Sequence, residues 1–229
     1  MRFFYFHDST ISNILAYLAL LFAFYTLYEI GYIYNDTETT KKEAAPTLRL
    51  SNTDIDYYED NKIKIYGTRG GLFVLFAILG YFISTNSNTL IVYTLCLFEL
   101  LVFQIYNHIR GRMSIPIFSL LEIFKYVPFA FISYEQLDLG MWMGILALYA
   151  IPNTIERLSF PRYNYQFFMN LLPSKKSYLY FRVLYCGFCV IIFGLLDIKE
   201  IWKNYFMYIF LFLLLFRVFA LSLEIKKHI

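Results

Sequence analysis

Apolar runs of about twenty residues recur along the sequence, and this feature limits the fold more than any other. A helix needs roughly 20 apolar residues to cross about 30 Å of hydrocarbon, where only helices or closed barrels satisfy their backbone groups. The runs that qualify or nearly qualify are residues 11–34, 69–86, 88–108, 114–133, 139–155, 178–197 and 203–223. With 59% hydrophobic and 16% charged residues, the chain is too apolar for an ordinary soluble domain. We predict an all-α, polytopic membrane helical bundle of about seven transmembrane helices, forming one domain over residues 1–229.

The polar segments between these runs differ in their content of lysine and arginine. The segments expected on one side include the loops 35–68, 109–113 and 156–177. Together with Arg69 at the edge of the first loop and with the chain end, they hold fourteen basic residues: Lys41, Lys42, Arg49, Lys62, Lys64, Arg69, Arg110, Arg112, Arg157, Arg162, Lys175, Lys176, Lys226 and Lys227. The opposite side holds three: Arg2, Lys199 and Lys203. Because basic residues favour the cytoplasmic side, we predict that the three loops are cytoplasmic and the N-terminus is outside.

Several charged residues fall within the apolar runs, where a charge costs several kcal/mol and usually faces a cavity or a partner. They are Glu29, Glu99, Glu122, Lys125, Arg182 and Arg217. Glu122 and Lys125 are three residues apart on one predicted helix, so we expect them to neutralise each other. For each of the others, structural pairing between helices is the alternative to a functional role. Cys186 and Cys189 have no second pair or His cluster near them, so we interpret them as small apolar residues.

Oxygen-bearing side chains gather at the end of the first run. The step Asn35-Asp36 is followed by Glu38 and Glu43, and a basic residue, Arg49, lies beyond. Mg²⁺ prefers one or two carboxylates, with phosphate oxygens and water completing its octahedron. An arginine supplies a planar fork for phosphate. Asp36, Glu38 and Glu43 are therefore candidate ligands for Mg²⁺, although as a bare pattern of acids a solvated, hydrogen-bonded turn is the favoured interpretation.

These residues resemble a known family. Asn35-Asp36, Glu43 and Pro46-Thr47-x-Arg49 are similar to the first aspartate-rich motif of the UbiA superfamily of intramembrane prenyltransferases. The likeness is closest to the polyprenyl-phosphate phosphoribosyltransferase branch. A second likeness is the stretch Tyr106-Asn107-His108-Ile109-Arg110-Gly111-Arg112, where that branch has a tyrosine followed by a lysine. Further similar points, in the same order along the chain, are Glu156-Arg157, Tyr178-x-x-x-Arg182 and Arg217.

The chain also departs from the family pattern at defined places. Thr39 stands where the second acid of the first motif belongs, and the spacing to Pro46 is one residue shorter. The basic residue of the second motif is Arg110 or Arg112 instead of a lysine. The superfamily usually has nine helices, and the first and last of these have no counterpart among the seven predicted runs.

The resemblance implies a UbiA-like fold and transfer of a phosphoribosyl group from phosphoribosyl diphosphate to a polyprenyl phosphate. Asp36 and Glu43 would be catalytic, with Mg²⁺ as cofactor. The implied substrate-binding residues are Asn35, Arg49, Tyr106, Arg110, Arg112, Glu156, Arg157 and Arg182. The expected partners are the polyprenyl phosphate, the diphosphate donor and membrane lipid, and a homo-oligomer is one expected assembly. The implied location is the bacterial inner (plasma) membrane, with the active site facing the cytoplasm.

Two alternatives remain open at the level of sequence. An aromatic prenyltransferase of the same superfamily would use an isoprenyl diphosphate, but it needs two acidic motifs and the second motif here is basic. A non-catalytic membrane partner or a transporter fits Thr39, the smaller number of helices and the charges within the runs. The sequence contains no P-loop, metalloprotease motif or nucleic-acid-binding module, so we expect no nucleic-acid partner.

Overall fold

The computed structural model describes residues 10–42, 49–84, 86–109, 111–133, 139–198 and 205–226. These residues form helices joined by short turns, and no strand occurs among them. Six helical segments are long and apolar enough to cross a membrane. The predicted fold class, an all-α polytopic membrane protein, is confirmed.

The six segments match six of the seven predicted runs, and the seventh, residues 139–155, has a different character. It is helical, but in three consecutive parts: α6 (Leu139–Ile145), the π-helix η4 (Leu146–Ala150) and α7 (Ile151–Leu158). Its second half contains Pro152, Asn153 and Glu156. Pro152 lies in the first turn of α7, where its missing N–H removes no helical hydrogen bond. The polar second half explains why this segment is not among the six.

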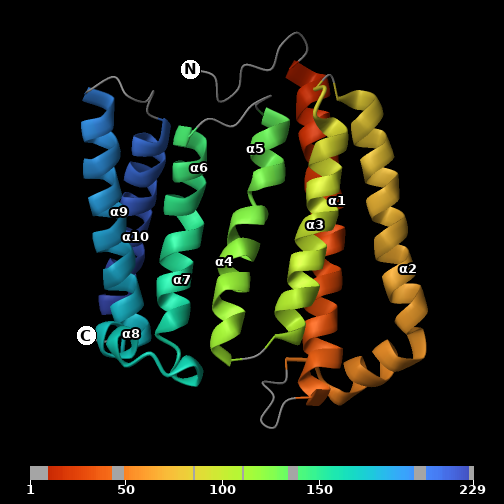
Figure 1. The fold of residues 1–229 in the computed structure, drawn as a ribbon, viewed down its shortest axis with the longest axis horizontal. Helices are drawn as coiled ribbons and strands as arrows, with labels where there is room; N and C mark the ends of the chain where they lie inside the picture. Colours follow the sequence, from red (N-terminus) through yellow and green to blue (C-terminus); the bar gives the residue numbers. More distant parts are fainter. Residues whose placement is uncertain are drawn as a thin grey trace. The chain divides into compact units, whose positions relative to one another are not determined.

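The sequence predicted one domain, and the structure divides into two compact units, unit 1 (residues 1–137) and unit 2 (residues 138–229). The α-helices of unit 1 are α1 (Thr10–Tyr34), α2 (Asn52–Ile83), α3 (Thr89–His108), α4 (Ser114–Phe124) and α5 (Val127–Ser133). Helix α1 packs against α2 and α3, and α3 packs against α4 and α5 (Figure 1).

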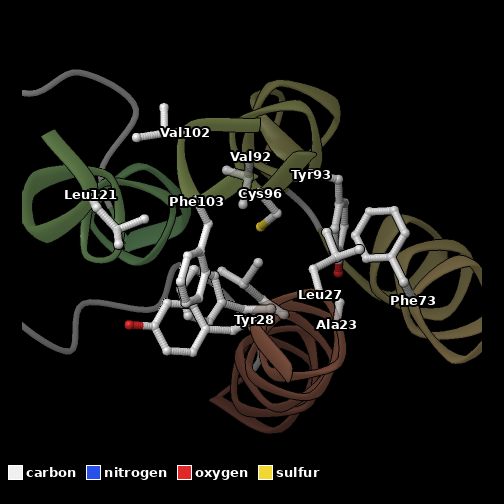
Figure 2. Packing of buried hydrophobic residues seen from close by; sticks show 12 residues of the cluster. Ala23, Leu27, Tyr28, Phe73, Val92, Tyr93, Cys96, Val102, Phe103 and Leu121 are labelled. Atoms are coloured by element: carbon white, nitrogen blue, oxygen red, sulfur yellow. The ribbon is translucent and has the colours of Figure 1, made fainter. Parts of the chain in front are cut away.

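The core of unit 1 forms where α1, α2, α3 and α4 meet (Figure 2). Leu27 and Tyr28 of α1 pack against Cys96 and Phe103 of α3. A Cβ atom on Gly31 would lie 2.1 Å from the ring of Phe103, so α1 and α3 approach closely only because this residue has no side chain. The close approach aligns the ends of these two helices.

The polar segment 35–68, expected as a loop, is helical over most of its described residues. Helix α1 continues through the π-helix η1 (Asn35–Thr39) and the 3₁₀-helix η2 (Thr40–Lys42). Helix α2 begins at Asn52, where Ser51 and Asp54 form a reciprocal capping box with N–O distances of 3.3 and 3.0 Å. With 32 residues, α2 is longer than the roughly 20 residues that cross the hydrocarbon of a bilayer. Figure 1 shows that its first turns run sideways at the lower end of unit 1 before the helix bends upward, so its polar first half lies at that end.

Unit 2 contains α6, η4 and α7, followed by α8 (Gln166–Leu171), α9 (Lys175–Ile198) and α10 (Tyr205–Lys226). Helices α9 and α10 pack side by side, with the rings of Phe193 and Phe210 stacked 5.3 Å apart. Cys186 and Cys189 are buried beside them as free thiols. This placement agrees with their interpretation as small apolar residues.

Candidate functional site

The two sequence motifs of unit 1 lie at the same end of it, the lower end in Figure 1, where α1 and α3 finish. The hydroxyl of Tyr34 and Nε2 of His108 are 3.1 Å apart, and the two rings lie 5.4 Å apart. The buried amide of Asn107 donates a hydrogen bond of 3.0 Å to the carbonyl of Gly31. These contacts join the residues just before Asn35 to the middle of the second motif.

The remaining residues of the second motif have different environments. The ring of Tyr106 packs between those of Phe103 and Phe118, at 6.4 and 6.0 Å. Arg112 lies in the short 3₁₀-helix η3 (Gly111–Met113), which is exposed. Arg110 lies outside the described residues. The second motif thus presents Arg112 at the surface and uses Tyr106 for packing.

The first motif brings an acid and a base together at this end. The amide of Asn35 donates to Oδ1 of Asp36 at 3.0 Å. An Nη atom of Arg49 lies 3.7 Å from the same oxygen, an ion-pair distance that is longer than a hydrogen bond. The side chain of Asp36 is 18% exposed and that of Arg49 is 60% exposed. The guanidinium of Arg49 is therefore accessible at the surface.

Glu38, expected as a metal ligand, is held by other groups. Its carboxylate accepts hydrogen bonds from the ammonium of Lys62 and from the hydroxyl of Tyr58, the latter at 2.8 Å. Lys41 lies 3.5 Å from its second oxygen and also binds Glu59 of α2. Glu38 therefore links the end of α1 to the polar half of α2 as one member of an ion-pair network.

The fit of Mg²⁺ can be tested against these contacts. Within the described ranges, no group of three or more His, Cys, Asp or Glu residues is placed to hold a metal ion. Thr39 occupies the position of the second motif acid and is buried, and Glu43 lies outside the described residues. Asp36 and Asn35 supply one carboxylate and one amide oxygen. This set fits Mg²⁺ that binds together with a diphosphate, for which one or two carboxylates suffice, and does not fit a site built by protein ligands alone.

Three further predicted residues, Glu156, Arg157 and Arg182, lie in unit 2, where Glu156 and Arg182 form a network with Asn153 and Arg157 has a contact of its own. The guanidinium of Arg182 binds both carboxylate oxygens of Glu156, with 2.9 Å between Nη2 and Oε2, and also binds Asn153. Nε of Arg157 donates to the hydroxyl of Tyr163 at 3.2 Å. The side chains of Arg182 and Glu156 are only 14% and 22% exposed. The network joins α7 to α9.

Two charged pairs within the membrane-spanning helices follow the sequence expectations. The expected pairing of Glu122 with Lys125 is confirmed, with an N–O distance of 3.0 Å. Glu29 of α1 pairs with Arg69 of α2 at 3.2 Å, which is the structural pairing between helices considered for it. Both pairs belong to unit 1.

The sequence interpretation missed the contribution of α2 to the end of unit 1 where the two motifs lie. Tyr58, Lys62 and Tyr66 follow one another at intervals of four residues on the face that meets Glu38, and the hydroxyls of the two tyrosines are 3.1 Å apart. A signal was present in the sequence, because Ser51 and Asp54 have the spacing of a capping box that starts a helix. We name the described residues 35–42 and 49–69, with the exposed Arg112, the charged end.

Comparison with known proteins adds no family assignment. No protein-family model, curated protein or solved structure matches this chain. Support for the function therefore comes from the motif resemblance and from the contacts of the charged end.

Proposed function

We propose that the chain is a membrane-embedded transferase that moves a phosphoribosyl group from phosphoribosyl diphosphate to a polyprenyl phosphate. The product would be a lipid-linked sugar donor for surface polysaccharide. The observation that supports this proposal is the meeting of the two motifs, since the contact of 3.1 Å between Tyr34 and His108 joins residues 74 positions apart. A transferase for a soluble donor and a lipid acceptor needs such a meeting point at the membrane boundary.

In the proposed reaction, the bond between ribose C1 and the diphosphate oxygen breaks, and an oxygen of the acceptor phosphate forms the new bond to C1. The bonding electrons leave with the diphosphate, and the acceptor oxygen is already anionic, so no proton has to be removed. Arg49 and Arg112 would hold the phosphates and stabilise the charge that develops on the leaving group. Asp36 would hold Mg²⁺ together with the diphosphate, and the metal would supply further positive charge for the leaving group.

The charged end suits these substrates because its cations remain accessible. The side chains of Arg49, Lys41 and Lys62 are 60%, 44% and 43% exposed. The polar half of α2 lies at this same end, which the proposal places at the membrane boundary, where the head group of a lipid acceptor lies. The proposal places the charged end on the cytoplasmic face of a bacterial inner membrane, following the distribution of lysine and arginine.

A second candidate is a membrane protein of the same ancestry that binds such lipids without catalysis. One observation favours it: Glu38 is occupied by Lys62 and Tyr58, and Thr39 replaces an acid, so only Asp36 remains as an available acid of the first motif among the described residues. An aromatic prenyltransferase is less favoured, because Arg112 gives the second motif a base where that chemistry needs acids.

The test of the proposal is an assay for transfer into lipid. The purified full-length protein is reconstituted with polyprenyl phosphate and Mg²⁺, and phosphoribosyl diphosphate labelled in the ribose is added. We expect label in the organic phase that depends on both the acceptor and the protein. The alternative outcome is label in the lipid phase from an isoprenyl diphosphate and an aromatic acceptor, with none from phosphoribosyl diphosphate. This result would favour an aromatic prenyltransferase over the proposed phosphoribosyltransferase. Binding of polyprenyl phosphate without transfer from either donor would favour the non-catalytic candidate.

A further inference from the structure

A buried carboxyl group in the interior of unit 1 takes no part in the function proposed above. Glu99 of α3 is completely buried, at 0% exposure. Neither of its carboxylate oxygens has a hydrogen-bond partner among the described residues. Glu99 lies in the middle of the span Thr89–His108, about 15 Å from either end at 1.5 Å per residue. It therefore sits near the centre of the hydrocarbon, far from the charged end.

The groups around Glu99 come from three helices and the turn after α4. Glu122 of α4 and Lys125 lie within electrostatic range of Glu99, as do Tyr28 of α1 and Cys96 of α3. Figure 2 shows Cys96, one turn before Glu99, directed from α3 toward α1. Helix α5 also packs on α3 and has no ionisable side chain, and no described residue of α2 or η1 contributes a charge that acts on Glu99.

The charges in this cluster do not balance when all groups are ionised. Glu122 already binds the ammonium of Lys125 at 3.0 Å, and Lys125 also lies 5.3 Å above the ring of Tyr28. One lysine faces two carboxylates, which leaves one negative charge in an apolar interior. An ionised carboxylate without a partner is strongly unfavourable there, and it neutralises by taking up a proton. Glu99 is the member that needs the proton, because Glu122 has the lysine.

We propose that Glu99 is a proton-binding site in the interior of unit 1, which holds one exchangeable proton. Loss of this proton gives Lys125 two competing carboxylate partners. Lys125 is at the break between α4, which ends at Phe124, and α5, which begins at Val127. Protonation of Glu99 therefore acts on the junction of these two helices.

Infrared difference spectroscopy on the full-length protein in lipid vesicles tests the proposal. Protonated carboxyl groups have a C=O stretching band at higher frequency than carboxylates, and it shifts in heavy water. We expect such a band in the wild type, its loss in Glu99→Gln, and its weakening as the pH is raised. The matched control is Glu29→Gln, because Glu29 is half exposed and paired with Arg69, and the band should persist in it.

Three outcomes would overturn the proposal. The first is a wild-type spectrum that lacks the band, and the second is a band that persists in Glu99→Gln and disappears in Glu122→Gln. The third is a band that Na⁺ removes at constant pH, which would make the site a metal-cation site. Because Glu99→Gln can also disturb folding, its circular dichroism and its elution as a single species are compared with those of the wild type. Glu99→Asp, which keeps the carboxyl group, is expected to retain a shifted band.

Discussion

The charged end of unit 1 and the Glu156–Arg182 network of unit 2 both contain residues that the motif resemblance selects, yet their contacts differ. Asp36 and Arg49 are 3.7 Å apart, and Arg49 is 60% exposed. Arg182 binds Glu156 through two nitrogens and Asn153 through one, and it is only 14% exposed. In the first pair the guanidinium is exposed and its distance to the acid is longer than a hydrogen bond, whereas in the second Nε and Nη2 of Arg182 are both bound to side chains of α7.

The difference separates groups that can bind a ligand from groups that hold helices together. Among the described residues, the only acid paired with Arg49 is Asp36, and a phosphate could compete for the guanidinium because this ion pair is long and exposed pairs are weak. A phosphate at Arg182 would have to displace a bidentate carboxylate in a largely buried place. Under the proposed function, phosphate binding is expected at Asp36, Arg49 and Arg112 of the charged end, and we expect Glu156 and Arg182 to stabilise unit 2.

The largest expected effect is on catalysis at the charged end. We expect Asp36→Ala to abolish transfer, a loss of roughly a hundredfold or more, as when a charge-stabilising group is removed from a site. The matched control is Asp56→Ala, which removes an exposed acid of the same end and should leave the rate unchanged. The rate of label transfer into lipid measures both. Equal rates in Asp36→Ala and the wild type would remove Asp36 from the site.

The next effect is on stability in unit 2. We expect Arg182→Ala to lower the free energy of unfolding by about 3 kcal/mol, the lower end for breaking a buried pair, since Glu156 then loses its partner. Arg182→Lys keeps the charge without the fork and should lose less. Arg162→Ala, which removes an exposed cation of the same unit, serves as the control. Unfolding in detergent gives all three values. An Arg182→Ala protein as stable as the wild type would contradict the structural role.

A smaller effect is expected on donor binding. Charge-assisted hydrogen bonds to phosphate contribute roughly 1.5–3 kcal/mol, so Arg112→Ala should raise the apparent KM for phosphoribosyl diphosphate about ten- to a hundredfold. Arg112→Lys should raise it less, and Lys64→Ala, an exposed cation of α2, should leave it unchanged. From the sequence motif, Arg110→Ala is expected to raise the apparent KM for phosphoribosyl diphosphate by the same factor. Unchanged KM values in both arginine variants would reduce these residues to determinants of membrane orientation.

The smallest effect tests the outer part of the ion-pair network. Lys41 and Glu59 form a pair whose side chains are 44% and 46% exposed. Such exposed pairs contribute at most about 1 kcal/mol, so Glu59→Gln should change the free energy of unfolding by no more than that. A loss close to that of Arg182→Ala would show that the charged end is as rigid as unit 2, and the comparison between the two regions would fail.

The sequence predicted the helical membrane fold because apolar length is a local property that hydropathy captures directly. It also predicted the Glu122–Lys125 pair, since residues three apart on a helix are neighbours. It did not predict the start of α2 at Asn52, because the polar residues from 52 to 68 resemble a loop in hydropathy. Only the helical spacing of Tyr58, Lys62 and Tyr66 reveals that they share a face.

Contacts between distant elements could not be predicted in this way. Glu156 and Arg182 were both selected by resemblance, but their bidentate pairing depends on how α7 packs against α9. Glu38 was interpreted as a metal ligand because it lies beside Asp36 in the sequence. Its partner Lys62 is 24 residues away, so the sequence did not show that this carboxylate is paired. The contact between Tyr34 and His108 could likewise not be predicted from the sequence, because it depends on the close packing of α1 on α3 at Gly31.

Helix α2 also has a consequence for how this protein can change during evolution. Of its 32 residues, which the structure describes throughout, Tyr58, Phe73 and Gly80 are buried. These positions are about four and two turns apart, so they lie along one stripe of the helix. A Cβ atom on Gly80 would lie 1.8 Å from the hydroxyl of Tyr93, so this position tolerates no larger residue without repacking. Around most of the membrane-spanning half of α2, one apolar residue should therefore replace another readily in natural variants. The buried stripe should change slowly, and its substitutions should be accompanied by substitutions in α1 and α3.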